Sequence, residues 1–236
     1  MLLLRGSGIV KTIKFKDPVY LGDCLNAVKI FNEKEVDELI IVDYKASLEE
    51  REPDLNRINE IASECFMPLV YGGGISSFEH AKNIFNQGVE KVIINSNSVN
   101  YNLISRIASV YGNQSVVISI DGKKNLMGKY GVYTHSGNYR IKTNLKDHLK
   151  NILNAGAGEI FLQSIDHDGT MKGYDIELLN EVKTFINVPL ILAGGAGKIS
   201  DFDLAFDSGA NAVAAGSMFV FKGRHKAVLI NYPEKQ

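Results

Sequence analysis

The chain has 236 residues, enough for one α/β barrel or two small domains, and its 45% hydrophobic and 22% charged residues are ordinary for a globular protein. Its formal net charge of −1 gives no long-range attraction to nucleic acid or to an anionic membrane, which excludes both as expected partners. Its two cysteines have no disulfide or metal-binding spacing, no apolar run is long enough for a membrane span, and the N-terminus is too short for a signal peptide, so we expect a cytoplasmic protein without a metal or cofactor.

Strand and helix patterns alternate along the whole chain. Eight continuous apolar runs predict strands of a parallel sheet that is buried on both faces. These runs are Leu2–Leu4, Leu39–Val42, Leu69–Tyr71, Lys91–Asn95, Val116–Ile120, Ile160–Gln163, Leu190–Ala193 and Ala212–Ala215. The amphipathic stretches between them predict helices over Leu21–Lys34, Leu55–Cys65, Ser77–Gln87, Asn102–Tyr111, Leu145–Ala155, Asp175–Phe185 and Ser200–Ser208. This alternation predicts an α/β protein with a single (β/α)8 TIM barrel, and a doubly wound open sheet is the alternative.

Two polar stretches depart from the barrel rhythm. Residues 9–18 predict a short hairpin and loop after the first strand, and residues 123–141 predict a hairpin inserted after the fifth. Both follow the carboxyl ends of strands, which is the face where barrel enzymes carry their active sites. No Pro/Ser-rich linker divides the chain, so residues 1–236 are expected to form one domain.

One segment of the chain recurs at a fixed spacing. Pro68–Gly74 returns as Pro189–Gly195, an offset of 189 − 68 = 121 residues. A repeat of strand, glycine-rich turn, helix and strand over half the length indicates a duplicated half-barrel, with halves of roughly 1–115 and 116–236. It argues against the open sheet, which needs a topological switch point. It also indicates two phosphate sites on one face, and therefore a substrate with a phosphate at each end.

The repeated turns are glycine-rich, and each follows a strand and opens a helix. Glycine lets backbone N–H groups approach and converge on a phosphate, although barrel turns also use glycine for packing alone. The neighbouring strand ends supply a second wall to each predicted site. The first predicted site comprises Gly73, Gly74, Asn95 and Ser96, and the second comprises Gly195, Gly216 and Ser217, with the loop Asp166–Thr170 as a further anion loop that contains Gly169.

Carboxylates stand at the predicted upper ends of several strands. Asp43, Asp121, Asp166 and Asp168 each follow an apolar run. In a barrel such groups face the pocket, where they can transfer protons or hold hydroxyl groups. Asp121 is the best catalytic candidate, whereas Asp43 has the alternative of capping its loop. His167 lies between Asp166 and Asp168, but this cluster has no second histidine, so its spacing disfavours a metal site.

Three charged residues open strands at the opposite end of the predicted barrel. They are Glu38, Lys91 and Glu159, and Glu38 maps on Glu159 by the same offset of 121. Surface salt bridges would explain them. A polar ring that closes the base of the barrel is the alternative, and such a ring could gate a small polar molecule that enters from a bound partner.

Together these motifs resemble the cyclase subunit of imidazole glycerol phosphate synthase over essentially the whole chain. The matching stretches are Asp37–Asp43 with Ala46-Ser47, Gly72–Ile75, Ser164–Thr170 and Gly194–Lys198. The resemblance implies a barrel that pairs with a glutaminase subunit in a heterodimer and passes ammonia to a small bisphosphorylated substrate. It places the ammonia gate at Glu38, Lys91 and Glu159, the essential aspartate at Asp121, and substrate and phosphate contacts at Asp43, Gly73, Gly74, Asn95, Ser96, Asp168, Gly169, Gly195, Gly216 and Ser217.

The chain departs from that family at three places. Leu3 stands where the family has a second essential aspartate, the family's N-terminal gate arginine has no counterpart, and Phe221–Pro233 replaces the final helix. The tail and the Leu-rich start resemble a paralogous branch linked to surface-polysaccharide biosynthesis. That likeness predicts delivery of ammonia for amination of a nucleotide-linked or phosphorylated sugar, beside a sugar amidotransferase. The alternatives are the histidine-pathway cyclase itself, with a substitute acid, and a non-catalytic activator of the glutaminase.

Overall fold

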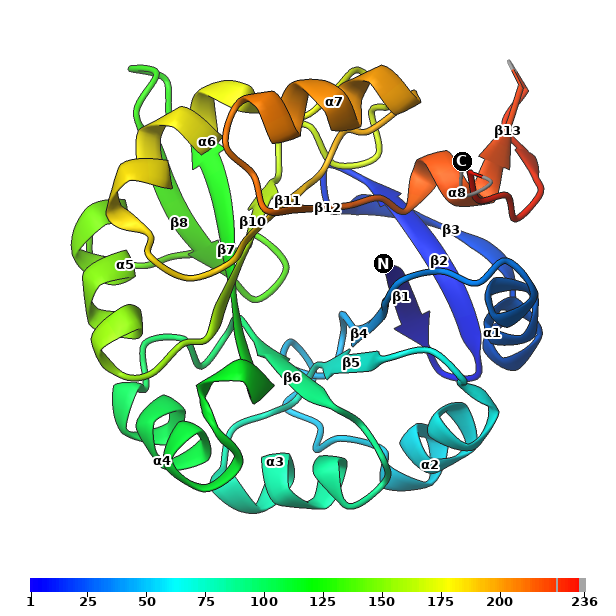
Figure 1. The fold of residues 1–236 in the computed structure, drawn as a ribbon, viewed down its shortest axis with the longest axis horizontal. Helices are drawn as coiled ribbons and strands as arrows, with labels where there is room; N and C mark the ends of the chain where they lie inside the picture. Colours follow the sequence, from blue (N-terminus) through cyan, green and yellow to red (C-terminus); the bar gives the residue numbers. More distant parts are fainter. Residues whose placement is uncertain (224, 234–236) are drawn as a thin grey trace.

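The computed structural model describes residues 1–223 and 225–233, and in that part of the chain the strands curl into a barrel with the helices outside (Figure 1). The barrel strands are β1 (Leu2–Arg5), β4 (Leu39–Asp43), β5 (Leu69–Gly72), β6 (Lys91–Ile94), β7 (Val116–Lys124), β10 (Glu159–Ser164), β11 (Leu190–Ala193) and β12 (Ala212–Ala214). Neighbours in this order pair in parallel. The predicted TIM barrel is confirmed.

Helices alternate with these strands. They are α1 (Cys24–Glu33), α2 (Leu55–Glu64), α3 (Phe78–Phe85), α4 (Tyr101–Tyr111), α5 (Leu145–Asn154), α6 (Ile176–Val182), α7 (Ile199–Asp207) and α8 (Ser217–Val220). Side-chain oxygens that accept a backbone N–H of the first turn set most of their starts, as at Asp23, Asp54, Ser77, Asn100, Asn144 and Asp175. Among the described residues, none of the helices is both long and apolar enough to cross a membrane.

The ring of strands is joined differently at one place. In the described part of the chain no ladder links β12 to β1, and the amino group of Met1, just before β1, donates to Ala215 O, just after β12, at 2.8 Å. The N-terminus therefore lies inside the ring of strands (Figure 1). Elsewhere the elements follow the repeat, because β5 and β11 both begin and end 121 residues apart, as 190 − 69 and 193 − 72 show. The boundary between the half-barrels near residue 115 stays a prediction.

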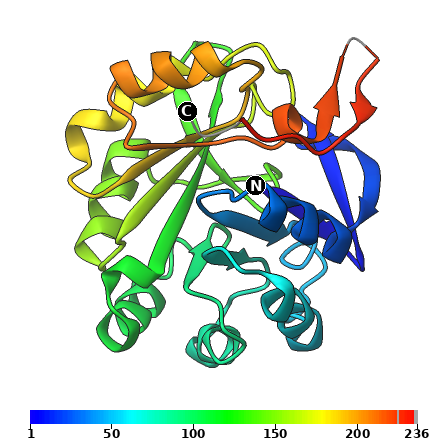
Figure 2. The same cartoon turned by 45° about the vertical axis from the view of Figure 1, so that its right-hand side comes forward.

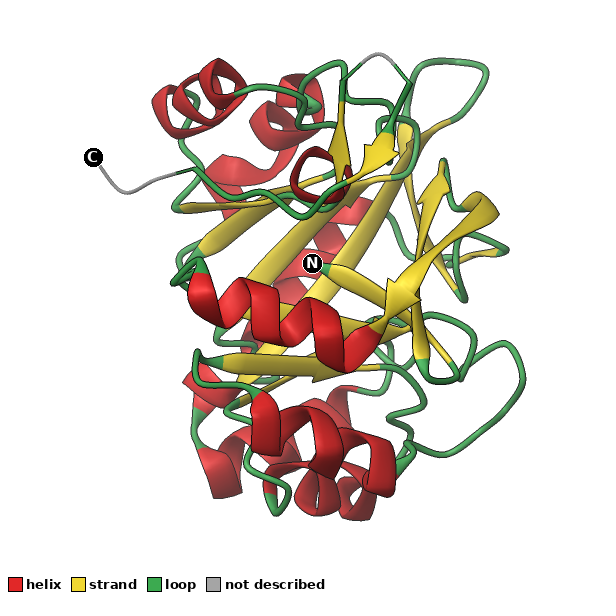
Figure 3. Cartoon of the chain, turned by 90° about the vertical axis from the view of Figure 1, so that its right-hand side faces the viewer, coloured by secondary structure: helices red, strands yellow, loops and turns green. Residues whose placement is uncertain are grey.

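Both predicted hairpins are present. β2 (Gly8–Ile13) and β3 (Lys16–Asp23) extend the sheet beyond β1, and β8 (Tyr130–Thr134) with β9 (Tyr139–Arg140) pairs with the end of β7. β3 is longer than the sequence indicates because it is an edge strand, where exposed residues and Pro18 are tolerated. Seen from the side, loops and short strands extend from one end of the barrel while the helices pack around the rest (Figure 3).

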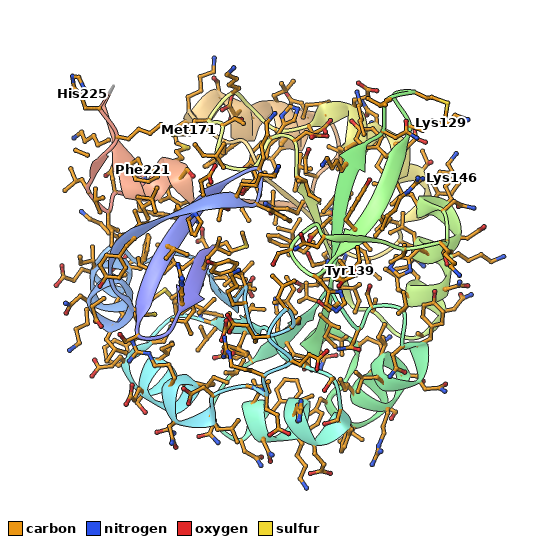
Figure 4. All side chains as sticks on the ribbon, turned by 180° about the vertical axis from the view of Figure 1, so that it is seen from behind. Lys129, Tyr139, Lys146, Met171, Phe221 and His225 are labelled. Carbon is orange, nitrogen blue, oxygen red and sulfur yellow. The ribbon has the colours of Figure 1, made fainter. Side chains whose placement is uncertain are left out.

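The C-terminal segment replaces a long eighth helix. Four-residue α8 leads into a small hairpin of β13 (Phe221–Lys222) and β14 (Ala227–Val228). The hairpin stands beside β2 and β3 at the edge of the barrel (Figure 2). Its tip at His225 lies at the periphery, away from the barrel axis (Figure 4). Further along, the Tyr232 hydroxyl donates to Asp37 Oδ2 at 2.9 Å, which ties the segment to the start of β4.

The core has two parts. The larger part lies between strands and helices, and a smaller one fills the inside of the barrel. The buried members of the inner cluster are Ile40, Val70, Ile93, Val117, Phe161, Ile191 and Ala193. These side chains alternate along the strands with residues of the outer core, as the two-residue period of a strand requires. The inner cluster lies across the inside of the barrel, and we call it the apolar layer.

Candidate active site

Two adjoining cavities lie at the carboxyl ends of the barrel strands. The larger has a volume of about 110 Å³, and its lining includes the predicted residues Asp43, Gly73, Gly74, Asn95, Ser96, Asp121 and Asp168. The smaller has about 20 Å³, and its lining includes Asp168, Gly169, Gly195, Gly216 and Ser217. Both cavities are lined by Met1, Gln163 and Asp168. The two groups of residues that the sequence assigns to separate phosphates thus lie in two cavities that share a wall.

The glycines of these cavities stand where no side chain fits. Gly74 has φ +71°, and an added Cβ would lie 2.5 Å from Arg51 O. Gly195 has φ +111°, and its Cβ would collide with Gly173 O. Both positions need the left-handed conformation as well as the space, so the turns before α3 and α7 require glycine. This geometry suits backbone N–H groups that face an anion, and phosphate binding itself stays a prediction.

Asp121 lies at the inner edge of the larger cavity, on β7. It is 7% exposed, and its Oδ1 accepts a hydrogen bond from Ser119 Oγ at 3.0 Å. Burial raises the pKa of Asp121 to about 7, the Ser119 hydrogen bond opposes that rise, and the charge of Asp168 adds to it. A carboxyl group with a pKa near neutrality can both give and take a proton at physiological pH.

Asp168 links the two cavities and the β2–β3 hairpin. Its Oδ2 accepts from Thr12 Oγ1 at 2.8 Å and from the Phe15 N–H at 3.2 Å, and its Oδ1 accepts from Gln163 Nε2 at 3.2 Å. Burial raises the pKa of Asp168, while these hydrogen bonds and the Lys11 ammonium oppose the rise. Because both oxygens already accept hydrogen bonds, Asp168 is suited to hold neighbouring groups in place.

Asp43 lies at the predicted position in the cavity wall, and its carboxylate is bound by neighbouring groups of the same loop. Arg51 Nη1 lies 3.0 Å from its Oδ2, and the N–H groups of Lys45 and Ala46 both donate to Oδ1 at 3.2 Å. These contacts fit the loop-capping alternative, and a substrate contact of Asp43 stays a prediction. The Asn95 amide nitrogen likewise donates to Ser119 O at 3.2 Å, which fixes that side chain beside Asp121.

Sequence reasoning missed Lys11. This side chain is 6% exposed, lines the smaller cavity, and donates from Nζ to Met1 O at 2.7 Å. Burial lowers the pKa of Lys11 to about 8, which the charge of Asp168 opposes. A lysine directly after the apolar residues Ile9 and Val10 was the available signal, although only the fold shows that its Nζ lies against Gly216 in the wall of the smaller cavity. Leu3 lines the larger cavity at 9% exposure and contributes an apolar side chain to its wall.

The three charged residues at the strand starts meet at the other end of the barrel. Lys91 Nζ lies 2.7 Å from Glu38 Oε1 and 2.8 Å from Glu159 Oε1. Burial disfavours the Lys91 ammonium, but the bonds to the two glutamates outweigh it and raise the pKa. The apolar layer separates this cluster, which we call the basal cluster, from the cavities. In the described part of the chain, no three His, Cys, Asp or Glu side chains group as a metal site.

The chain is similar to known proteins over nearly its whole length. Residues 3–226 match the model of the family described as histidine biosynthesis protein. A Pseudomonas aeruginosa protein with the provisional name imidazole glycerol phosphate synthase subunit hisF2 is 51% identical, over 99% of this chain and 94% of its own length. A Leptospira interrogans protein, provisionally named as the HisF subunit of that synthase, is 49% identical over 100% and 94%. A Chlorobium phaeobacteroides protein, named imidazole glycerol phosphate synthase subunit HisF, is 41% identical over 93% and 88%.

Proposed function

The chain belongs to the histidine biosynthesis protein family, and on that premise we propose that it is the synthase subunit of a complex of the imidazole glycerol phosphate synthase type. In this role it receives ammonia from a glutaminase subunit and adds it to bisphosphorylated ribulosyl aminoimidazole carboxamide, yielding imidazole glycerol phosphate and aminoimidazole carboxamide ribotide. The names of the relatives suggest this activity. The observation that carries the proposal is the order of features along the barrel, from charged base through apolar layer to paired cavities with an acid–base group.

The lower half of the barrel suits passage of ammonia. The basal cluster is a ring of ion pairs in which Lys91 bridges Glu38 and Glu159. Above it the apolar layer disfavours charged species, because an ion that leaves water for an apolar surrounding loses its solvation. Neutral NH3 is small and loses far less solvation free energy than an ion does. A glutaminase docked at this end would therefore supply NH3 rather than NH4⁺ to the cavities.

The upper half of the barrel suits a ligand with two phosphates, and it places an acid–base group between the two predicted phosphate sites. The glycine turns at Gly74 and Gly195 belong to different cavities that meet at Asp168. Asp121 supplies the group that accepts a proton from the attacking nitrogen and returns one to a leaving group. Asp168, held by Thr12 and Phe15, keeps the hairpin tip against the larger cavity. Lys11 adds a positive charge to the smaller cavity, where a phosphate would need it.

Leu3 is the observation that favours a second candidate function. With leucine on β1, the site has one fewer carboxylate for the acid–base steps of ring closure. Simple delivery of ammonia to a nucleotide-linked or phosphorylated sugar, next to a sugar amidotransferase, needs fewer such steps. The relatives' names give no support to this sugar reading, so we place it second. A glutaminase activator without its own substrate would have no use for two anion cavities.

An assay with ammonium chloride at pH 8.5 and the bisphosphorylated substrate, without any partner, tests the proposal. We expect turnover that saturates with ammonium, at a rate about 10²–10⁴ below that of a site with both carboxylates. Asp121→Asn is the matched inactive control. Absence of turnover, with substrate binding intact by calorimetry, would refute the histidine-pathway substrate and favour the sugar. Absence of binding as well would contradict both candidates.

A further inference from the structure

One buried polar group in the site has no role in the steps above. Gln163 is 3% exposed and lines both cavities. Its Nε2 donates to Asp168 Oδ1 at 3.2 Å, but its Oε1 has no hydrogen-bond partner in the part of the chain that the structure describes. Buried polar atoms are nearly always paired, and an unpaired acceptor costs about 1–3 kcal/mol. An acceptor that the fold leaves unpaired beside an acid–base group calls for a donor from a ligand.

The position of Gln163 on β10 places it at the upper end of the proposed ammonia path, beyond the basal cluster and the apolar layer. Glu159, Phe161 and Gln163 are spaced by two residues, so their side chains point to the same side of the strand. Glu159 belongs to the basal cluster and Phe161 to the apolar layer, which shows that this side is the barrel interior. At about 3.3 Å per residue, Gln163 lies roughly 13 Å from Glu159 along β10. In the ladder with β7 its partner is Asp121.

The orientation of the amide is fixed by its neighbour. Asp168 is an acceptor at both oxygens, so the Gln163 nitrogen and not its oxygen faces the carboxylate. The oxygen is therefore committed to accepting. The larger cavity that Gln163 and Asp121 share is bounded below by Phe161 of the apolar layer. Gln163 and Asp121, neighbours in the β10–β7 ladder, therefore both lie in the wall of this cavity next to the apolar layer.

We propose that Gln163 is a positioning residue for ammonia, which donates one N–H to Gln163 Oε1 while its lone pair stays free to attack the substrate. The inference rests on the proposed function and deepens it. A neutral amide suits the task better than a carboxylate would, because a carboxylate favours the ammonium ion, whose lone pair is blocked by a proton. Gln163 makes and breaks no covalent bond. Its effect is to hold the nitrogen beside Asp121, which takes up the proton released as the new C–N bond forms.

A magnetic-resonance titration tests the contact without requiring turnover. The side-chain NH2 signals of Gln163, labelled with ¹⁵N and identified by their loss in Gln163→Met, are followed while ammonium chloride is added at pH 9. We expect a shift that saturates in the millimolar range and is absent with sodium or tetramethylammonium chloride at equal ionic strength. No shift with ammonium would overturn the inference, and so would an equal shift with the other salts. Because the signal does not depend on catalysis, it separates this inference from the proposed function.

Kinetics supply the second readout and its control. In Gln163→Met we expect the KM for ammonium to rise roughly three- to tenfold, the effect of one neutral hydrogen bond, with an unchanged KM for the phosphorylated substrate. Thr12→Val is the matched control, because it removes the other side-chain hydrogen bond to Asp168 and leaves Oε1 in place. Because Thr12 holds Asp168 in the site, Thr12→Val is expected to lower kcat, but the KM for ammonium should rise only in Gln163→Met. A parallel rise in both variants, or a rise in the KM for the phosphorylated substrate, would show that Gln163 acts through Asp168 or binds the substrate instead.

Discussion

Asp121→Asn should stabilise the protein while it removes the activity. The pKa of Asp121 is raised by burial from 3.8 to about 7, so in the native state this group stays protonated over a pH range in which the unfolded chain has lost its proton. Stability from this source is complete below about pH 4 and is lost as the pH rises through 7. A shift of three units corresponds to about 4 kcal/mol at 1.36 kcal/mol per unit. Asparagine has the shape of the protonated acid and does not ionise, so the variant escapes that loss.

Urea unfolding of the two proteins at several pH values measures the effect. At pH 5 the native chain has lost only part of this stability, and at pH 8 it has lost all of it, so the advantage of Asp121→Asn should grow by about 3 kcal/mol between these values. At pH 8, where Asp121 of the native chain is ionised and can accept a proton, activity with ammonium should fall by about 10²–10⁴ in Asp121→Asn. A stability difference that stays constant with pH would refute the argument that burial places this carboxyl group near neutrality. A stability difference that shrinks as the pH rises would show that the pKa of Asp121 is shifted in the opposite direction.

Three further changes test other parts of the account. Lys91→Met should remove the charge that bridges Glu38 and Glu159 and lower the free energy of unfolding by about 1–3 kcal/mol. It should also reduce the glutamine-dependent rate more than the ammonium-dependent rate. Equal reductions of the two rates would contradict a role of the basal cluster in ammonia entry. Gly195→Val should abolish calorimetrically measured binding of the phosphorylated substrate, because the added Cβ collides with Gly173 O. The control Gly6→Val should bind the substrate normally, because Gly6 also has a positive φ but no atom lies within 4 Å of its added Cβ. Unchanged affinity in Gly195→Val would count against the smaller cavity as a phosphate site. Leu3→Asp should raise the ammonium-dependent rate, because it adds a carboxylate to the wall of the larger cavity. An unchanged or lower rate would show that Leu3 does not limit the chemistry.

The repeat in the sequence was enough to predict the barrel and most of its rim. Continuous apolar runs fix the parallel strands, and the shared offset of β5 and β11 brings Gly74 and Gly195 to the same face. Asp121 follows from the same logic, because it comes directly after the apolar run Val116–Ile120, although β7 itself continues to Lys124. These features depend on local periodicity and on the barrel rule that strand ends converge, both of which can be read from one sequence.

Other features depend on contacts that sequence patterns do not encode. The capture of Asp43 by Arg51, eight residues later, is a loop contact, and the pattern alone left its role undecided. Lys11 lies on a hairpin whose approach to the smaller cavity depends on the hydrogen bonds of Thr12 and Phe15 to Asp168. Four-residue α8 has no amphipathic period to reveal it. In each case the deciding interaction joins segments by tertiary packing rather than by spacing.

Isotope tracing of the transferred nitrogen tests the central claim most directly. The chain is combined with a glutaminase subunit, glutamine labelled with ¹⁵N at the amide, the bisphosphorylated substrate and a large excess of unlabelled ammonium chloride, at a pH where most of the ammonium stays protonated. If NH3 travels from the partner past Lys91 and through the apolar layer, the imidazole product should carry mainly ¹⁵N. If the product instead contains ¹⁵N in proportion to the free ammonia in solution, the nitrogen arrives from the open end of the barrel, and the account is contradicted.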